Sequence, residues 1–306
     1  MSLRVFVTGA SGFVGQHLIK CLSDRHPDWE IETSRFDVAD REATRAALRQ
    51  ASPEVCLHLA AISSIGRAKE RPENAWNVNV HGTLLLGEAL REVNPEATLL
   101  FASTSEVYGD TFREGRALDE AALLSPTNLY AVTKAAADLA LGALAHQGLR
   151  VVRLRPFNHT GAGQSSDFVV AAFARQLARI EAGLQHPVIQ VGNLSAERDF
   201  VDVGDICLGY ALCIEKRDEI ASGSIINLCS GQARSVESIL YDLIALFGVK
   251  VHVQTDAALM RPVDIARAVG SNERAKMLLG WEPATDWRLT LEQVVEYWRA
   301  KTRREI

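Results

Sequence analysis

The chain has 306 residues, of which 47% are hydrophobic and 23% charged, and its formal net charge is −5. This is an ordinary globular composition for one large or two modest domains, and its acidic balance argues against a nucleic-acid partner, which usually needs a basic face. No apolar run approaches the ~18 residues of a membrane span, and no secretory leader precedes the first apolar run. We therefore expect neither a nucleic-acid nor a membrane partner, and a cytoplasmic location.

The cysteines point to neither a disulfide framework nor a metal site. Their number is odd and none forms a CxxC pair, whereas a disulfide scaffold or a zinc site needs paired spacings. We expect free thiols in a reducing compartment and no metal. The five residues are Cys21, Cys56, Cys207, Cys213 and Cys229.

The first half of the chain alternates short apolar runs with helical patterns. Strands are expected over residues 3–7, 31–34, 54–59, 98–102 and 150–154. Helices are expected after the first strand as far as residue 22, and over 41–50, 72–93 and 128–146. Strands that alternate with helices predict an α/β fold, with a parallel sheet covered by helices on both faces and joined by right-handed crossovers.

The second half is less regular and predicts a smaller domain interleaved with the sheet. Helices are expected over 168–182, 205–216, 235–247, 272–279 and 289–299, and strands over 186–191, 224–228 and 249–253. We expect a first domain over 1–157, with contributions from about 199–230. A second, smaller domain is expected over 158–198 and 231–306.

A glycine-rich turn, TGASGFVG, follows the first expected strand and directly precedes a helix. Its GxxGxxG spacing lets the backbone approach a pyrophosphate whose charge lies at the helix N-terminus. Because the turn opens a strand–helix–strand pattern, it predicts dinucleotide binding; a tight turn without a ligand is the alternative. The expected cofactor-binding residues are Gly9, Ser11, Gly12, Phe13, Val14 and Gly15.

The end of the second expected strand bears on the choice of cofactor. An acid there binds the ribose 2′-hydroxyl of NAD, whereas a nearby arginine accepts the 2′-phosphate of NADP. Ser34 stands at the expected acid position and Arg35 follows it, which favours NADP(H). Glu32, one register away, keeps NAD(H) possible. Asp37 and Val38 come soon after and are placed to meet the adenine edge.

Tyr130 and Lys134 form a YxxxK pair on an expected helix. Residues four apart share a helical face, and an ammonium close to a phenol favours the phenolate and lowers its pKa. Such a pair exchanges a proton with a carbonyl or an alcohol near neutral pH. A solvated helix face is the alternative explanation of the same spacing.

These segments together resemble the extended short-chain dehydrogenase/reductase family. The motifs are TGASGFVG, LHLAA at 57–61, NVNVHGT at 77–83, ASTSEVYG at 102–109 and YAVTK at 130–134. The resemblance implies a Rossmann-type doubly wound sheet, with Thr104 completing the catalytic set of Tyr130 and Lys134, and Ser103 and Ser105 as supports. It also implies cofactor contacts from Leu59, Ala60, Ala61, Tyr130 and Lys134, with Lys134 holding the nicotinamide ribose. A homodimer through the helices at 72–93 and 128–146 is a further implication.

The second half carries motifs that suggest a nucleotide-sugar substrate, on which this family mostly acts. They are RPFNHTGAGQ at 155–164, VGNLSAERDFVDVGDI at 191–206 and MRPVDI at 260–265. Arg198 and Arg261 are suited to grip a diphosphate through charge-assisted hydrogen bonds, Asn158 to donate to it, and Asp264 to accept from the ribose. The motifs look most like those of GDP-4-keto-6-deoxy-D-mannose reductases, which form GDP-D-rhamnose.

Several alternatives stay open at this point. Glu106 directly behind the catalytic hydroxyls also resembles GDP-mannose 4,6-dehydratases, in which a glutamate takes part in the elimination of water, so we count it among the catalytic candidates. Phe13 speaks against that group, whose turn resembles GxDG. A nucleotide-sugar 4-epimerase and a non-catalytic NADP-binding sensor are further alternatives. The stereochemistry at C4 and the nucleotide base are not determined by the sequence.

Overall fold

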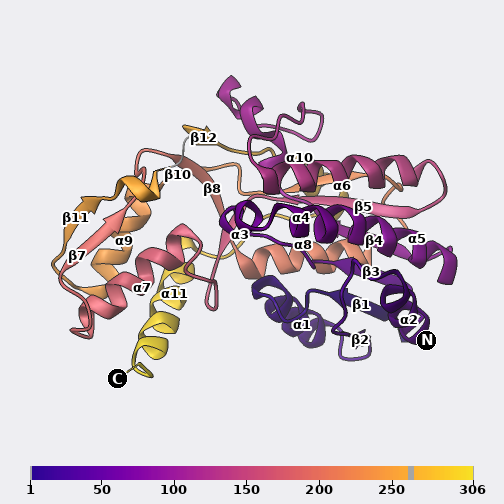
Figure 1. Cartoon of the computed structure of the whole chain (residues 1–306), viewed down its shortest axis with the longest axis horizontal. Helices are drawn as coiled ribbons and strands as arrows, with labels where there is room; N and C mark the ends of the chain where they lie inside the picture. The colour runs from indigo at the N-terminus through magenta and orange to yellow at the C-terminus, as the bar shows by residue number, and fades with distance from the viewer. Residues whose placement is uncertain (1, 261–264, 306) are drawn as a thin grey trace.

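The computed structural model describes residues 2–260 and 265–305 and is built around a parallel sheet. Six strands pair in the order β2-β1-β3-β4-β5-β9, every pair parallel (Figure 1). Their bounds are β1 Arg4–Thr8, β2 Glu30–Glu32, β3 Val55–His58, β4 Thr98–Ala102, β5 Arg150–Pro156 and β9 Ile225–Leu228. The α/β prediction is confirmed, and β9 joins the sheet from far along the chain.

Helices cover both faces of the sheet because its strands are apolar on both sides. Val5 and Val7 of β1 lie in one core cluster with α1 (Phe13–Arg25) and α8 (Val203–Glu215). Phe6, between them, points to the opposite face, in a cluster with α2 (Arg41–Ala51), α5 (Thr83–Val93) and α6 (Leu129–Ala145). The alternation of side chains along a strand thus divides the core into two layers.

The helix expected over 72–93 contains a π-helical turn. α4 (Pro72–Trp76) passes into η1 (Asn77–Gly82), and η1 continues as α5. A further short helix, α3 (Ile65–Glu70), precedes them and was not predicted. π-helical turns are concentrated at functional sites, and this one carries the buried Asn79 towards the edge of the sheet described below.

A second unit packs beside the carboxyl ends of the sheet strands (Figure 1). Its core lies between α7 (Val169–Glu181), α9 (Val236–Phe247) and α11 (Trp287–Thr302). β7 (Val188–Val191) pairs with β11 (His252–Thr255). β8 (Glu197–Asp202) pairs with the short strands β6 (Asn158–Thr160), β10 (Ala233–Ser235) and β12 (Arg267–Ala268). Sequence patterns did not predict β8 or its three partners.

The remaining elements are three helical segments. η2 (Ser105–Glu114) and η3 (Ala257–Leu259) are 3₁₀ helices. α10 (Glu273–Leu279) and Trp281, although inside the range expected for the second domain, pack in the cluster of the sheet. The domain boundaries stay a prediction.

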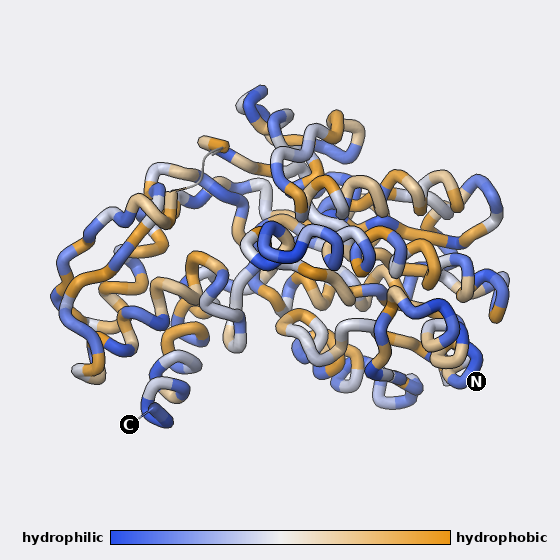
Figure 2. Tube along the Cα trace, in the orientation of Figure 1, coloured by the Kyte–Doolittle hydropathy of each residue, from blue (hydrophilic) through white to orange (hydrophobic). Residues whose placement is uncertain are grey.

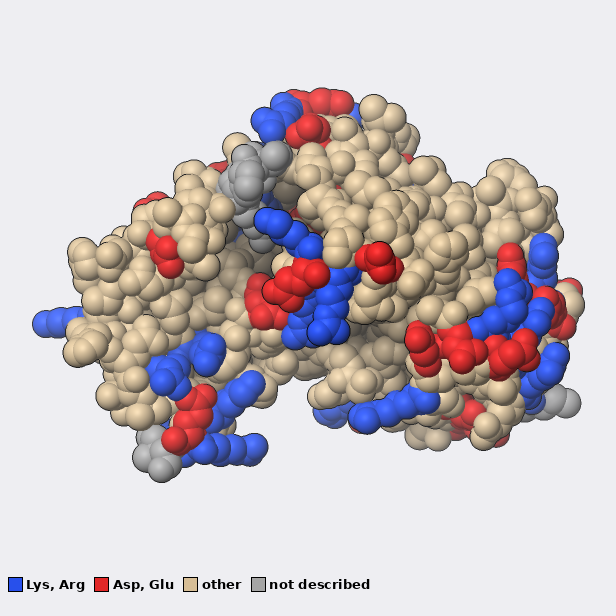
Figure 3. All heavy atoms as spheres, in the orientation of Figure 1, with Lys and Arg blue, Asp and Glu red and all other residues tan. Residues whose placement is uncertain are grey.

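Apolar residues follow the sheet strands and one side of most helices (Figure 2). Over the described ranges, no helix combines the length and apolar character needed to cross a membrane. On the face shown in Figure 3, basic and acidic side chains gather over α2 and α5, where Arg45 pairs with Glu92 at 3.0 Å and Arg41 with Glu88 at 3.6 Å. Within those same ranges no three His, Cys, Asp or Glu side chains cluster as metal ligands.

Candidate active site

The candidate site lies where the carboxyl ends of β1, β3 and β4 meet at one edge of the sheet. In an open parallel sheet, ligands bind in the crevice outside these ends. The glycine turn follows β1, the segment Leu59-Ala60-Ala61 follows β3, and Thr104 follows β4. The fold therefore brings three sequence-predicted segments together at the edge that a dinucleotide would occupy.

The glycine turn is shaped by close backbone approach. Gly9 has a φ of +72°, and a Cβ on it would lie 2.7 Å from the backbone nitrogen of Ala60. A Cβ on Gly15 would lie 2.4 Å from the carbonyl oxygen of Gly9. Gly12 is the N-cap of α1 and makes no side-chain cap bond, so the first amides of the helix are left for a ligand. These residues fit a bound pyrophosphate.

The rest of the turn faces the second unit. Ser11 is exposed, and Phe13 and Val14 are half-buried. The Phe13 ring stacks with that of His159 at a centroid distance of 6.3 Å, and His17 Nε2 lies 2.8 Å from the carbonyl oxygen of Ala162. A pocket of about 320 Å³ opens beside the turn. Its lining residues are Ser11, Phe13, Gln16, His17, Ala162, Gly163, Ser165, Ser166 and Lys301.

The segment after β3 is held by hydrogen bonds to β1 on one side and to η1 on the other. The amides of Leu59 and Ala60 donate to the carbonyl and the hydroxyl oxygen of Thr8 at 3.2 and 3.3 Å. Asn79, which the sequence analysis did not single out, accepts from the Ile62 amide at 2.8 Å and donates to the Thr133 hydroxyl at 3.0 Å. Asn79 thus joins the loop after β3 to the helix of Tyr130 and Lys134.

The candidate NADP determinants follow β2. Arg35 is exposed three residues beyond the end of β2, and Glu32, also exposed, is the last residue of that strand. The Asp37 carboxylate accepts from the Ala39 amide at 2.9 Å. Val38 is buried against Gly82. An exposed guanidinium and an exposed carboxylate therefore both lie near the expected ribose position.

Thr104 and Tyr130 are brought together as the motif predicts. Thr104 is the N-cap of η2, and its hydroxyl accepts from the Glu106 amide at 3.2 Å. The prediction that Tyr130 has a lowered pKa is wrong for this structure. Burial raises the pKa of Tyr130 to about 12, the hydrogen bond between the hydroxyl groups of Thr104 and Tyr130 opposes that rise, and the negative charge of Glu106 adds to it.

Lys134 is almost wholly buried one helical turn after Tyr130. Its Nζ lies 4.2 Å from the centroid of the Phe101 ring of β4. Burial lowers the pKa of Lys134 to about 7, and the carboxylate of Asp138 partly opposes that change. The lysine therefore titrates near neutral pH, because its surroundings offer little to replace water.

Glu106 belongs to η2, and its side chain lies near Tyr130 and near Asn128, the N-cap of α6. Its carboxylate accepts a hydrogen bond at 3.3 Å from the side-chain amide of Asn128, and Asn128 caps α6 by accepting from the Ala131 amide at 2.9 Å. Glu106 is half-buried. Its carboxylate is thus held close to Tyr130 and remains accessible to a substrate.

A buried charge network behind Lys134 was not foreseen. Arg155 donates to both carboxylate oxygens of Asp138, at 2.9 and 3.0 Å, and Arg153 to one of them at 3.2 Å. Burial alone would raise the pKa of Asp138, but the hydrogen bonds and charge of Arg155 hold it below its usual value. Asp138 four residues after Lys134 was the sequence signal that could have shown this network.

The candidate substrate residues are only partly described. Asn158 begins β6 and lies opposite Phe200 in the β6–β8 register. Arg198 lies in β8, and one of its guanidinium nitrogens donates to the Glu197 carbonyl at 2.9 Å. Arg261 and Asp264 lie outside the described residues. The set expected to hold the diphosphate and ribose therefore stays a prediction.

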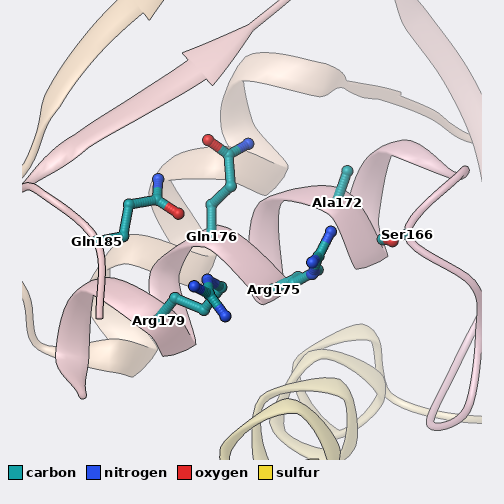
Figure 4. Close-up of a pocket in the computed structure, with 6 residues that line it drawn as sticks. All are labelled: Ser166, Ala172, Arg175, Gln176, Arg179 and Gln185. Carbon is teal, nitrogen blue, oxygen red and sulfur yellow. The ribbon is translucent and has the colours of Figure 1, made fainter. Parts of the chain in front are cut away.

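Another pocket, of about 270 Å³, lies along α7 (Figure 4). Arg175 and Arg179 extend from one side of the helix, and Gln176 points to the side where Gln185 lies. None of the residues predicted to bind cofactor or substrate, or to act in catalysis, lines it. The chemistry expected from the sequence therefore belongs to the edge of the sheet and not to this pocket.

Comparisons with known proteins agree with this geometry. The profile of the family described as GDP-mannose 4,6 dehydratase matches residues 23–294. GDP-6-deoxy-D-mannose reductase from Pseudomonas aeruginosa is 33% identical over 100% of both chains. GDP-6-deoxy-D-talose 4-dehydrogenase from Aggregatibacter actinomycetemcomitans is 26% identical over 94% of both. The solved structure of RMD from Pseudomonas aeruginosa complexed with NADPH has a TM-score of 0.90 and 31% identity, and the match covers 98% of this chain and 100% of that one.

The doubly wound sheet, the glycine turn and the Thr104–Tyr130–Lys134 group define an oxidoreductase of the extended short-chain dehydrogenase/reductase class, as the sequence predicted. Within that class, the chain belongs to the GDP-mannose 4,6 dehydratase family.

Proposed function

We propose that the protein reduces the C4 ketone of GDP-4-keto-6-deoxy-D-mannose with NADPH and yields a GDP-6-deoxyhexose, either GDP-D-rhamnose or its C4 epimer. The observation that carries the proposal is the hydrogen bond between the hydroxyl groups of Thr104 and Tyr130 at the edge of the sheet. Tyr130, with a pKa of about 12, holds its proton at neutral pH and shares a hydrogen bond with Thr104. A ketone that becomes an alkoxide needs both groups.

In this mechanism the chain's residues position the ketone and supply its proton. NADPH, when bound along the glycine turn, supplies the hydride. Thr104 donates its hydroxyl hydrogen bond to the C4 oxygen. Tyr130 then transfers its phenolic proton to that oxygen, and the protonated form of Lys134, one turn along α6, favours the phenolate that is left.

The second unit would hold the nucleotide. We assign the diphosphate to Arg198, Arg261 and Asn158, and the ribose hydroxyls to Asp264. Guanidinium groups match phosphate oxygens through charge-assisted hydrogen bonds. Arg198 lies in β8, whose neighbour β6 directly follows the Rossmann strand β5, and this proximity supports a sugar that reaches towards Tyr130.

The first test is NADPH oxidation, followed by absorbance, with the keto sugar generated in place from GDP-mannose by a separate dehydratase. The wild type should oxidise NADPH. Tyr130→Phe should lower kcat by about 10²–10⁴-fold and still bind NADPH, whereas Tyr241→Phe, on exposed α9 surface, should behave as wild type. Equal activity in both variants would refute the role of Tyr130, and an inactive wild type would refute the substrate.

Glu106 supports a second candidate function, a GDP-mannose 4,6-dehydratase. A carboxylate held beside Tyr130 by Asn128 can serve as the extra base that elimination requires. The same incubation without the added dehydratase separates the two functions. Release of a 4-keto sugar from GDP-mannose by this protein alone would favour the dehydratase. A nucleotide-sugar 4-epimerase would instead interconvert C4 epimers without net consumption of NADPH, and a sensor would bind NADPH without turnover.

We also propose a homodimer in the cytoplasm, formed through the helices at 72–93 and 128–146. Leu139 of α6 is 59% exposed, and an apolar side chain on that face would be buried by a second copy. Leu139→Glu should convert a dimer to a monomer in light scattering. Leu289→Glu on α11, which removes another exposed leucine, should not.

A further inference from the structure

One buried guanidinium touches both of the segments that carry the proposed catalytic groups. Arg155, the penultimate residue of β5, is 2% exposed. Its Nε and Nη2 donate to the two carboxylate oxygens of Asp138 at 3.0 and 2.9 Å. Its Nη1 donates to the hydroxyl oxygen of Tyr108 at 3.1 Å. Arg155 is therefore hydrogen-bonded to two different elements, to α6 through Asp138 and to η2 through Tyr108. We call these two connections its arms.

The two partners occupy matching positions in those elements. Asp138 lies four residues after Lys134 in α6, and Tyr108 lies four residues after Thr104 in η2. Each arm thus ends about one helical turn beyond a catalytic residue. The backbone confirms that the strands are adjacent, because the Ser103 amide donates to the Leu154 carbonyl at 2.7 Å.

The Tyr108 arm is itself fixed to the sheet. Its hydroxyl donates to Asn227 Oδ1 on β9 at 2.7 Å, and the backbone amide of Asn227 donates to the Glu120 carboxylate at 2.8 Å. Tyr108, Asn227 and Asp138 are fully buried. Burial leaves these polar groups no water as an alternative partner, so their geometry is strongly determined.

The stability of the fold does not by itself account for such a network. Buried ion pairs are often no better than apolar side chains of similar volume, because desolvation offsets their attraction. An apolar residue in place of Arg155 could fill the same space, but it would not hold α6 and η2 at one fixed separation. The fork of the guanidinium does so with three directed hydrogen bonds.

We propose that Arg155 is a positioning residue, which sets the separation between the Thr104 hydroxyl and the Tyr130–Lys134 pair. It acts through Tyr108 and Asp138 and does not touch the substrate. The proposal rests on the proposed reductase function. A shift of about 1 Å between reacting groups costs up to about a hundredfold in rate, so loss of one arm should lower kcat and leave binding intact.

Three variants test this inference. Tyr108→Phe deletes one hydroxyl and should lower kcat about tenfold. Arg155→Met deletes both arms and should lower kcat about a hundredfold. Arg153→Met is the matched control, because Arg153 also contacts Asp138, at 3.2 Å, but donates otherwise only to the backbone carbonyls of Asp138 and Gly223; its kcat should stay within threefold. KM for the keto sugar and Kd for NADPH should stay within twofold in all three.

The double variant Tyr108→Phe/Arg155→Met shows whether the two residues act through one shared contact or lower kcat independently. If Tyr108 acts only through Arg155, then adding Tyr108→Phe to Arg155→Met should lower kcat no further. If Arg155→Met does not fold, as judged by circular dichroism and NADPH binding, Tyr108→Phe alone decides, because it removes a single atom.

Two results would overturn the inference while the wild type is active. One is an unchanged kcat in Tyr108→Phe, and the other is an equal loss in Arg153→Met, which would make Arg155 only a charge partner of Asp138. A wild type without NADPH oxidation would instead overturn the proposed function, and this inference with it.

Discussion

Lys134 should make the unfolding free energy of the protein increase as the pH rises above 7. Its pKa in the folded protein is about 7, against an ordinary value of 10.5. Between these two values the unfolded chain holds a proton that the folded protein has released. Stability therefore rises with pH across this window, and this contribution is lost as pH falls towards 7.

The expected size of this change in unfolding free energy follows from the two pKa values of Lys134. One proton of difference changes the unfolding free energy by at most ~1.4 kcal/mol per pH unit. Because Lys134 is already half deprotonated near pH 7 in the folded state, its contribution grows by about 2 kcal/mol from pH 7 to pH 9. That is a large part of the usual 5–15 kcal/mol stability of a domain.

Urea unfolding of the protein without cofactor at pH 7, 8 and 9 measures this contribution. The wild type should gain about 2 kcal/mol relative to Lys134→Met over that range, and Lys134→Met should be the more stable of the two at pH 7. Lys69→Met removes an exposed lysine of α3 and should run parallel to the wild type. Parallel curves for the wild type and Lys134→Met would refute the burial argument.

Three further outcomes follow from the same site. Gly9→Ala should abolish NADPH binding, because its Cβ would meet Ala60 at 2.7 Å, whereas Gly183→Ala, with a φ of +73° and nothing within 4 Å, should cost only about 1 kcal/mol of stability. Burial lowers the pKa of His58 to about 3, so its ring should stay neutral at pH 5 in nuclear magnetic resonance; a charged ring would contradict this. Arg35→Ala should raise KM for NADPH at least tenfold and leave that for NADH unchanged; equal effects on both would shift the ribose contact to another residue.

Local patterns were enough for the sheet, its helices and the glycine turn. Each depends on residues close in sequence: β-branched runs for β1 and β5, an apolar stripe for α7, and glycines where the backbone must approach itself. The Thr104, Tyr130 and Lys134 segments were likewise predictable, because a strand end and one helical turn place them. Bounds of the strands in the six-stranded sheet moved by only one or two residues, as at β2 (Glu30–Glu32), whereas β11 begins at His252, three residues later than expected.

What local patterns could not supply is non-local pairing. β8, with the sequence ERDFVD, reads as a charged loop, and only its pairing with β6, β10 and β12 makes it a strand. Arg155 and Asp138 read as surface charges, and only the packing of α6 on β5 buries them together. The raised pKa of Tyr130 has the same origin, because sequence spacing predicts a nearby lysine but gives no measure of burial.

The electrostatics of the site bear on which direction of proton transfer it is built for. Burial and the charge of Glu106 raise the pKa of Tyr130, while burial lowers that of Lys134, so the two pKa values are driven apart and both groups favour their neutral forms. Near neutral pH the phenol therefore holds its proton, and the lysine can exchange one. An alkoxide that forms at Thr104 is a stronger base than this phenolate and takes the proton readily. A base for elimination must instead be deprotonated before the reaction begins, and the Glu106 carboxylate beside Tyr130 suits that role. Replacement of Glu106 by Gln should therefore leave ketone reduction within about tenfold of the wild type, because the Tyr130 proton donor remains, and should abolish any release of 4-keto sugar from GDP-mannose. A loss of both activities, with NADPH binding intact, would make Glu106 part of the reduction itself.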